Sequence, residues 1–420
     1  MKKLISIAAA LMLTASLGAQ EVQAQGAQSV QAQVQGAQSV EVQAAEQAYT
    51  INHGPYLQGL TYDGVIVCFT TSHKGFSKVE LREKGSAEVR EYRTSKHGLY
   101  EAFNTHNVIE INDLKPATEY EYRIVSKQMV RFDPYHVRFG AEAVSEWLAF
   151  RTFNPEAKEL TFVVANDIHD QTEKCRKMLE VQPLEEVDMV FYNGDILSYY
   201  AKEEQPFTSF IDVSVEKFAK NKPFAVVRGN HETRGYLART YEKFIHNTRD
   251  GKYYGVYYFG DTAVVMLDGG EDKDDEHPVY AGLVDFDNYR REQAEWLKGV
   301  VASEAFQRAK HRIAIMHIPP VTERMAEIEA QKADIRNLIT WRGGEHLGEL
   351  MIPILNGADI DVMICGHLHR HVVYPEQAGV LEFPIVVNDN VSSMLVRTNA
   401  EGVHLKIVNI DGKTTFEKTY

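Results

Sequence analysis

The chain has 420 residues, a length that corresponds to two or three domains at roughly 150 residues each. Hydrophobic residues make up 44% and charged residues 25% of the sequence, which is the composition of a folded protein and excludes disorder throughout. The formal net charge of −14 argues against binding to nucleic-acid duplexes, since proteins that do so present a basic surface to the phosphates. Cys68, Cys175 and Cys365 form no C-x-x-C pair, so neither a thiolate zinc site nor a disulfide framework is expected. The apolar runs around Cys68 and Cys365 predict buried thiols.

The amino terminus has the pattern of a secretory signal peptide. Two lysines precede an apolar run from Leu4 to Leu13, and small and polar residues follow through Ala19. The run is too short to cross about 30 Å of hydrocarbon as a helix. We therefore expect residues 1–19 to be removed on export to the periplasm or the extracellular space, and the mature protein to have no membrane span.

Residues 20–46 form a low-complexity segment. Gln, Ala, Ser and Gly dominate it, and the block QGAQSV occurs at 25–30 and again at 35–40. Because no apolar stripe is present that could be buried, this segment is predicted to be a flexible spacer.

Residues 47–153 carry short alternating runs such as VIVCFTT and EYEYRIV, separated by Gly, Asn, Asp and Pro. This spacing predicts a small all-β sandwich domain. The segment LKPATEYEY at 114–122 resembles the tyrosine corner of fibronectin type III domains. The segment GPYLQGLTYDGVIVCFTT at 54–71 resembles the start of the amino-terminal domain of purple acid phosphatases. The two resemblances lie at opposite ends of the segment and imply the same kind of domain.

Residues 154–420 have a different texture, because apolar runs now alternate with helical patterns. This alternation predicts a layered α/β domain in which helices flank a sheet. Helices are expected near 171–181, 207–220, 288–303 and 346–356.

Polar side chains follow five of the apolar runs, where each predicted strand ends. In α/β sheets, ligands bind beyond the carboxyl ends of the strands, so these side chains should meet at one place. The runs and the residues after them are LTFVVA before Asn166-Asp167-Ile168-His169, DMVFYN before Gly194-Asp195, FAVVR before Gly229-Asn230-His231-Glu232, RIAIM before His317, and VMIC before Gly366-His367-Leu368-His369.

The residue types at these strand ends suit a pair of metal ions. In an extended segment, residues i and i+2 point to the same side, so Asp167 and His169 can act together at a metal site, as can His367 and His369. Carboxylate, imidazole and amide ligands suit zinc, iron or manganese. One carboxylate can bridge two ions about 3.5–4 Å apart. The glycine at the start of the GD, GNHE and GHLH motifs is expected to allow a tight turn.

In their order, the motifs DxH, GD, GNHE, a lone His and GHxH resemble those of the calcineurin-like metallophosphoesterase superfamily. With the β domain, the chain most resembles purple acid phosphatase-like proteins, over about residues 50–420. The resemblance implies that one ion is bound by Asp167, His169, Asp195 and His369, and the second by Asp195, Asn230, His317 and His367, with Asp195 as the bridge. It also implies that His231 faces the substrate, and Glu232 is expected to orient His231 from outside the ligand set.

The sequence departs from the purple acid phosphatase pattern after Asp195. Those proteins place a metal-binding tyrosine three residues beyond this aspartate, where the present chain has Ser198, followed by Tyr199 and Tyr200. We therefore expect two divalent ions (manganese, zinc or ferrous iron) rather than a ferric-tyrosinate centre.

Together these features predict an exported phosphoester hydrolase that uses a metal-bound water or hydroxide to attack a small-molecule phosphoester. His231 is the candidate for protonating the leaving oxygen or stabilising its charge. The alternatives are a phosphodiesterase or nucleotide hydrolase with the same metals, and a surface-binding protein whose metal site is structural. The motifs of serine hydrolases, P-loop proteins, Rossmann enzymes and zincins are absent. The sequence leaves the oligomeric state open.

The acidic stretch EDKDDE at 271–276 is a further candidate cation site. It lacks the pattern of an EF-hand loop, so it is expected to be a solvated mobile loop.

Overall fold

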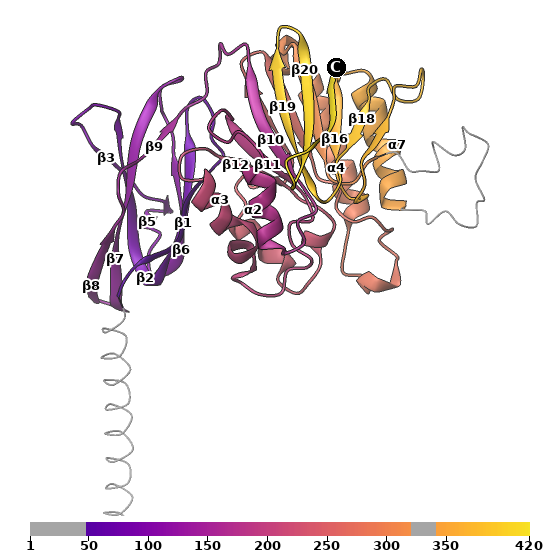
Figure 1. The fold of residues 1–420 in the computed structure, drawn as a ribbon. Helices are drawn as coiled ribbons and strands as arrows, with labels where there is room; N and C mark the ends of the chain where they lie inside the picture. The colour runs from indigo at the N-terminus through magenta and orange to yellow at the C-terminus, as the bar shows by residue number, and fades with distance from the viewer. Residues whose placement is uncertain (1–47, 321–341) are drawn as a thin grey trace, which may run out of the picture.

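The computed structural model describes residues 48–320 and 342–420. The predicted signal peptide (1–19) and spacer (20–46) lie outside these residues. The described chain forms an amino-terminal β part and a larger part in which helices cover two sheets (Figure 1). None of the described helices has the length and apolar character needed to cross a membrane.

The amino-terminal part is built on one seven-stranded antiparallel sheet. The long strand β2 connects two groups of strands in this sheet. Its first part pairs with β1 and β6, and its second part pairs with β3 and β7. Strands β8 and β9 pair with β7. The strands are β1 (Ile51–Gln58), β2 (Val65–Glu83), β3 (Arg90–Tyr92), β6 (Asn104–Ile111), β7 (Glu119–Asp133), β8 (His136–Val144) and β9 (Leu148–Arg151), beside a short hairpin of β4 (Ser95–Lys96) and β5 (Leu99–Tyr100).

The two groups of strands in this sheet share one core. Along β7, Tyr120, Tyr122 and Ile124 are buried at every second position, as expected for a strand with one face in a core. They pack in one cluster with Leu57 of β1 and Val67 of β2. The all-β character predicted for this part is confirmed, whereas its boundaries and its likeness to fibronectin type III domains stay predictions.

The larger part contains two six-stranded sheets. The first has the strand order β12-β11-β10-β19-β20-β21 and the second the order β13-β14-β15-β16-β18-β17. The strands of the first are β10 (Leu160–Ala165), β11 (Met189–Asn193), β12 (Phe224–Val227), β19 (Ser392–Asn399), β20 (Gly402–Asn409) and β21 (Thr414–Thr419). Those of the second are β13 (Gly255–Phe259), β14 (Thr262–Leu267), β15 (His311–Met316), β16 (Val362–Cys365), β17 (Val372–Tyr374) and β18 (Ile385–Val387).

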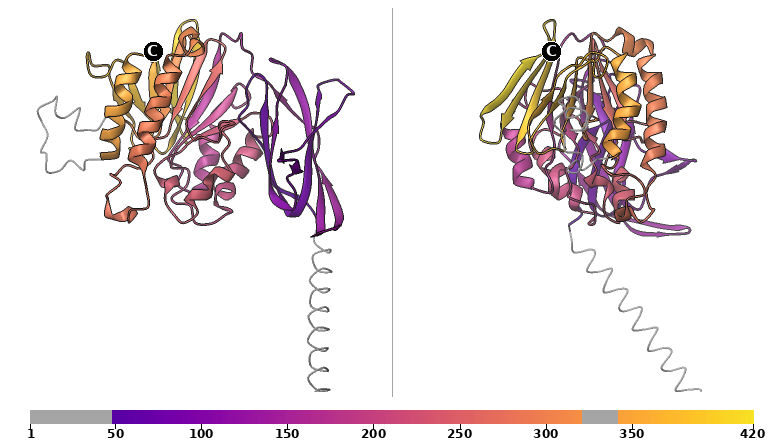
Figure 2. Two further views of the ribbon diagram at one scale, coloured as in Figure 1. Left: turned by 180° about the vertical axis from the view of Figure 1, so that it is seen from behind. Right: turned by 90° about the vertical axis from the view of Figure 1, so that its right-hand side faces the viewer.

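Helices cover the outer face of each sheet, so this part has four layers (Figure 2). The first sheet carries α2 and the continuous η1–α3 segment, and the second carries α4, α5 and α7. The three cysteines are buried free thiols in the two outer cores. The helices are α2 (Thr172–Glu180), η1 (Phe207–Ile211), α3 (Asp212–Lys217), α4 (Phe286–Val301), α5 (Glu304–Arg308) and α7 (Arg342–Asn356), with short 3-10 turns η2 (His231–Thr233), η3 (Ala238–Lys243) and η4 (Pro278–Tyr280).

The alternation along β10 shows how each sheet serves two cores. Phe162 and Val164 point into the core between the sheets, whereas Val163 and Ala165 point toward the helices. The predicted α/β class is confirmed, but the single sheet expected from the sequence is corrected to two. Strands that are buried on both faces read as continuous apolar runs, and such runs do not reveal how strands divide between sheets.

The strands that carry the five motifs end at a common edge. In the first sheet β10, β11 and β12 run parallel to one another, and in the second β15 and β16 do so. Neighbouring strands also end at nearly the same level, because Ala165 lies opposite Tyr192 and Ile315 lies opposite Ile364. The loops that follow these strands are therefore delivered to the same end of the two-sheet core.

The β part packs on the helical layer of the first sheet. The Leu57 N–H donates to the Ala219 carbonyl at 3.0 Å, and the Tyr122 hydroxyl donates to the Lys220 carbonyl at 2.7 Å. Cys68 of β2 belongs to the core beneath this layer. The two parts thus bury surface against each other next to the carboxyl end of α3.

Candidate metal centre

Three of the five motif loops, those after β10, β11 and β16, leave their strands through left-handed backbone conformations. Asp167, His169, Asp195, His367 and His369 have φ angles of 53°, 52°, 52°, 71° and 53°. The expectation that the paired residues lie on extended segments is therefore wrong, because the chain curls at each of them. Non-glycine residues in this region cost about 1–2 kcal/mol each, and such strain gathers at functional sites.

Backbone hydrogen bonds join the loops to one another. The N–H of Asp167 donates to the Gly194 carbonyl and that of His169 to the Asp195 carbonyl, each at 2.9 Å. The N–H of His367 donates to Asp167 Oδ2, also at 2.9 Å. The loops of both sheets are thus tied together around the Asp167 side chain.

The glycines of the motifs have two different roles. Gly194 has a φ of +77°, so the predicted tight turn is present there. At Gly229 and Gly366 the constraint is close approach, because a Cβ would lie 2.4 Å from Asp195 Oδ1 and 2.8 Å from Asp167 Oδ2, respectively. These two glycines let the backbone pass beside the carboxylates.

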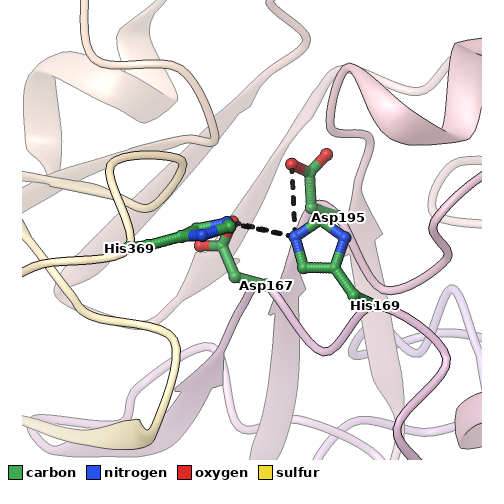
Figure 3. Close-up of side chains that lie close together, drawn as sticks. All are labelled: Asp167, His169, Asp195 and His369. Carbon is green, nitrogen blue, oxygen red and sulfur yellow. Dashed lines mark hydrogen bonds and ion pairs between the residues drawn. The ribbon is translucent and has the colours of Figure 1, made fainter.

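Four of the predicted ligands form one group. Asp167, His169, Asp195 and His369 each offer an atom within 4.8 Å of the others. Figure 3 shows these side chains pointing toward one another from three loops. Nε2 of His369 lies 3.1 Å from Asp167 Oδ1 and 3.1 Å from His169 Nε2, and His169 Nε2 lies 3.9 Å from Asp195 Oδ2.

A second group shares Asp195 with the first. Asp195, His317 and His367 also offer atoms within 4.8 Å of one another, and His317 Nε2 lies 3.0 Å from Asp195 Oδ2. The Asn230 carboxamide borders this group: one of its terminal atoms lies 3.3 Å from Asp195 Oδ1 and 3.0 Å from His367 Nδ1. The structure thus brings together all seven residues predicted as ligands, in the two predicted sets.

The electrostatics of the two groups fit cations. Asp167 Oδ1 and His317 Nε2 are buried and form no hydrogen bond of good geometry, which suits atoms that coordinate a metal. Burial would raise the pKa values of Asp167 and Asp195, but His317 beside them holds both below the usual range. Burial would likewise lower the pKa of His317, yet the two carboxylates raise it to about 10. Two carboxylates that are buried together are stabilised only if positive charge lies beside them. The nitrogen and oxygen atoms available here are ligands that suit zinc, iron or manganese.

His231 lies at the edge of the two groups. Its Nδ1 lies 2.6 Å from the Ser198 carbonyl, which can only accept, so Nδ1 carries the hydrogen. Nε2 lies 3.1 Å from Arg234 Nη1 and 3.9 Å from Asp195 Oδ2. Burial lowers the pKa of His231, although Asp195 opposes this effect. The neutral ring that this favours would accept a hydrogen bond at Nε2 from Arg234 Nη1.

Glu232 has a role other than the predicted one. Its buried carboxylate accepts hydrogen bonds from the backbone N–H groups of Gly229, Asp195 and Leu197 at 2.8–2.9 Å. Burial, reinforced by Asp195, raises its pKa to about 7. The expectation that Glu232 orients His231 is therefore corrected, because the carboxylate holds together the backbones of two ligand loops and the Ser198 carbonyl orients His231.

The loop after Asp195 places its two tyrosines differently, Tyr199 at the surface and Tyr200 in a core. Asp170 accepts hydrogen bonds from the Ser198 N–H at 2.9 Å and the Ser209 hydroxyl at 2.8 Å, which fixes the start of this loop. Tyr199 is 56% exposed, and Tyr200 is fully buried in the core under the helices. This arrangement agrees with the presence of Ser198 in the sequence at the position where purple acid phosphatases have a tyrosine.

The acidic stretch at 271–276 begins inside the protein. Glu271 and Asp272 are 1% and 7% exposed, so the expectation of a solvated loop is wrong for these two residues. Glu271 accepts from Arg234 Nε and Nη2, both at 2.9 Å, and this pairing brings Arg234 beside His231. Sequence reasoning missed Arg234, because the carboxylates that hold it in place, those of Glu271 and Asp272, lie far along the chain.

Residues 160–371 match the family model described as calcineurin-like phosphoesterase. The chain belongs to this family. It is similar to Purple acid phosphatase 21 of Arabidopsis thaliana, with 23% identity over 281 residues that cover 65% of this chain and 54% of the relative. Purple acid phosphatase 22 of the same plant is 24% identical over 297 residues, which cover 69% of this chain and 57% of the relative. The chain thus spans just over half the length of these relatives.

A solved structure has the same fold as this calcineurin-like phosphoesterase. It is that of the purple acid phosphatase PPD1 from yellow lupin (Lupinus luteus) seeds, with a TM-score of 0.62 and 15% identity. The match covers 87% of this chain and 73% of that one, so it extends beyond the family-model region. The predicted resemblance and fold class are confirmed.

Asp195 is the residue on which both groups of this calcineurin-like phosphoesterase depend. We expect Asp195→Asn to weaken metal binding at both positions by more than about 100-fold. Loss of a residue that only hydrogen-bonds to a metal ligand already costs about 10–100-fold in metal affinity. Metal content after dialysis and turnover should fall together. Asp188→Asn, at the opposite end of β11, is the control and should keep both. Full metal occupancy with near-normal turnover in Asp195→Asn would remove Asp195 from the bridging role.

Proposed function

We propose that this protein hydrolyses phosphate esters at a centre of two divalent cations. The observation that carries the proposal is the pair of ligand groups that share Asp195 at the common edge of the two sheets. One set is formed by Asp167, His169, Asp195 and His369, and the other by Asp195, Asn230, His317 and His367. Such ions, when bound, would neutralise phosphoryl oxygens and make a bound water acidic enough to react near neutral pH.

The protein's own residues would prepare the centre for this chemistry. Asp195 would face both cations, while Glu232 fixes the backbone N–H of Asp195 at 2.9 Å and so limits its movement. His369 is the most open of the ligands, because 46% of its side chain is exposed. Substrate would therefore approach from the side of His369 and His231. Attraction of the anionic ester would come from this local positive charge, since the chain as a whole carries a net charge of −14.

His231 is the proposed partner of the leaving group. It lies beside both ligand groups without belonging to either, and its side chain is 28% exposed. Its Nδ1 is held by the Ser198 carbonyl, so Nε2 is the atom that would face the departing oxygen. Protonation of Nε2 would end the hydrogen bond that it accepts from Arg234 Nη1, and a phosphoryl oxygen would be a suitable new acceptor for that N–H.

Manganese, zinc or ferrous iron are the proposed ions. Asp, His and Asn supply oxygen and nitrogen donors that suit all three. Ser198 is a poor substitute for a tyrosine ligand, because an alkyl hydroxyl ionises far less readily than a phenol of pKa about 10. With Tyr199 exposed and Tyr200 buried in the core, a phenolate would not stabilise ferric iron here.

The domain organisation and location are also proposals. We take residues 1–19 as a signal peptide, 20–46 as a spacer, 47–153 as a β domain and 154–420 as the catalytic domain. The support for export is the charge and hydrophobicity pattern of the first nineteen residues. The protein would then act in the periplasm or outside the cell.

The first test is turnover of nitrophenyl phosphate and bis-nitrophenyl phosphate by metal-loaded protein. We expect hydrolysis that a chelator abolishes and that manganese, zinc or ferrous iron restores. Turnover of the diester alone would make the protein a phosphodiesterase. No turnover of either ester with both metals bound would contradict the proposal and favour a binding protein with a structural metal site.

The second test removes the imidazole of His231. We expect His231→Ala to keep both metals and to lose about 10²–10⁴-fold in rate, the usual range for a proton-transfer group. The loss should be smaller for esters whose leaving group is a weak base, because these need little protonation. His404→Ala changes a histidine of similar exposure on β20 and serves as the control. Equal losses across leaving groups would show a role in binding phosphate, and loss of metal would make His231 a ligand.

The third test uses colour. A phenolate bound to ferric iron absorbs strongly in the visible, so we expect protein loaded with iron in air to lack an intense band. Tyr199→Phe should leave the spectrum unchanged, as should the control Tyr62→Phe, which alters another exposed tyrosine. A strong band that disappears only in Tyr199→Phe would refute the assignment and place that phenolate on the metal.

A further inference from the structure

The guanidinium of Arg234 lies at the rim of the candidate metal centre. Its Nη1 is 3.1 Å from His231 Nε2, and its Nη2 is 2.9 Å from the Asn230 carboxamide. Both neighbours belong to the GNHE motif, which contributes a proposed ligand and the proposed leaving-group partner. Arg234 therefore brings a permanent positive charge beside the proposed metal ligands.

Buried carboxylates hold Arg234 in this position. Glu271 receives two parallel hydrogen bonds from Nε and Nη2, each 2.9 Å long, and Asp272 Oδ1 lies 3.3 Å from Nη2. The Thr233 hydroxyl donates to Glu271 Oε1 at 2.8 Å and so fixes the carboxylate in turn. A two-point contact of this kind sets the plane of the guanidinium as well as its distance.

The edge of Arg234 that bears Nη1 is turned away from these acids. Among the residues that the structure describes, Nη1 forms a hydrogen bond only with His231, and it carries two hydrogens. The Arg234 side chain is 31% exposed, in contrast to 1% for Glu271. One N–H of Nη1 is therefore directed toward His231, and the other can meet a ligand that enters beside it.

Two other cations near the motifs are differently placed. Arg228 is paired with Asp268 at 2.8 Å, and its side chain is only 13% exposed. Lys174 donates to the Asp167 backbone carbonyl at 2.8 Å, which places it behind the loop that carries this ligand. Both charges are engaged by the fold itself, whereas Nη1 of Arg234 contacts only His231 among the described residues, and the Arg234 side chain is partly exposed.

We propose that Arg234 donates a hydrogen bond to a terminal phosphoryl oxygen and makes the site prefer phosphate monoesters to diesters. This inference rests on the proposed function. A monoester has three terminal oxygens and close to two negative charges, so one oxygen remains for Arg234 after two face the metal ions. In a diester, that third position is an esterified oxygen, which is a weaker acceptor and carries no charge. Arg234 thus adds stabilisation mainly for monoesters.

The test compares variants of the metal-loaded full-length protein. Arg234→Lys keeps a charge near Glu271 but loses the planar two-point contact, Arg234→Gln removes the charge, and Glu271→Gln keeps the arginine while loosening its anchor. Arg249→Lys is the matched control, because Arg249 has a similarly exposed side chain (35%) and also contacts two carboxylates, those of Asp63 and Glu110. Metal content is measured for each variant.

Three quantities are measured: kcat/KM for nitrophenyl phosphate, kcat/KM for bis-nitrophenyl phosphate, and the inhibition constant of inorganic phosphate. In Arg234→Lys and Arg234→Gln, we expect monoester kcat/KM to fall by about 10- to 100-fold and phosphate inhibition to weaken by a similar factor, as for loss of a hydrogen bond to a charged group. Diester kcat/KM should change little. Glu271→Gln should shift the monoester-to-diester ratio in the same direction by less, and Arg249→Lys should leave it unchanged.

A purely structural role for Arg234 would leave the ratio and the phosphate inhibition unchanged, and this result would overturn the inference. Equal losses for both esters would overturn it as well. If Arg234→Gln does not fold, Arg234→Lys and Glu271→Gln decide the question by the same ratio. Wild-type protein that turns over neither ester would overturn the proposed function, whereas wild-type turnover with an unaltered ratio in the variants would overturn only the role of Arg234.

Discussion

The centre depends on two carboxylates that are buried side by side. Asp167 and Asp195 are 0% and 1% exposed, and each lies within 4 Å of His317 Nε2. Burial of like charges is costly unless positive charge is close by, so this pair sets what the surrounding structure has to provide. Imidazoles from the four loops after β10, β12, β15 and β16 lie beside the carboxylates. Two of these loops, those after β10 and β16, contain left-handed conformations that most residues avoid.

Two acidic residues beside the candidate metal centre, Glu232 and Asp170, hold the loop backbones in place. The carboxylate of Glu232 spans the N–H groups of two loops, and that of Asp170 holds the N–H of Ser198. The Ser198 carbonyl in turn fixes the tautomer of His231. A series of hydrogen bonds therefore links the conformation of this loop to the orientation of the His231 ring. Arg234 continues this series outward to Glu271.

The sequence was sufficient to predict which residues gather at the strand ends, because each follows an apolar run and the motifs occur in the order of a known superfamily. It was also sufficient for the α/β class, since apolar runs and helical patterns alternate. It could not predict that β10 and β15 lie in different sheets. A strand that is buried on both faces is a continuous apolar run, and such a run does not indicate which sheet the strand joins. Nor could it predict the left-handed turns at Asp167 and His367, because such conformations are imposed by contacts between loops.

The acidic stretch illustrates a different limit of sequence reasoning. Local composition made a solvated loop the expected structure, but Glu271 is buried because Arg234, 37 positions earlier, compensates its charge. The same holds for Glu232, whose partners are backbone groups that no side-chain pattern reveals. Pairings of this kind depend on tertiary structure, so they become visible only when the loops are placed in space.

The proposed metal ligands come from both sheets, and this arrangement has a thermodynamic consequence. Asp167 and Asp195 follow strands of the first sheet, whereas His317 and His367 follow strands of the second, so bound cations would act as a staple across the inter-sheet core. Ions that bind the native chain but not the unfolded one add about 2.7 kcal/mol of stability when their concentration is 100 times the dissociation constant. Metal supply in the compartment where the protein resides would thus set how firmly the two sheets are held together.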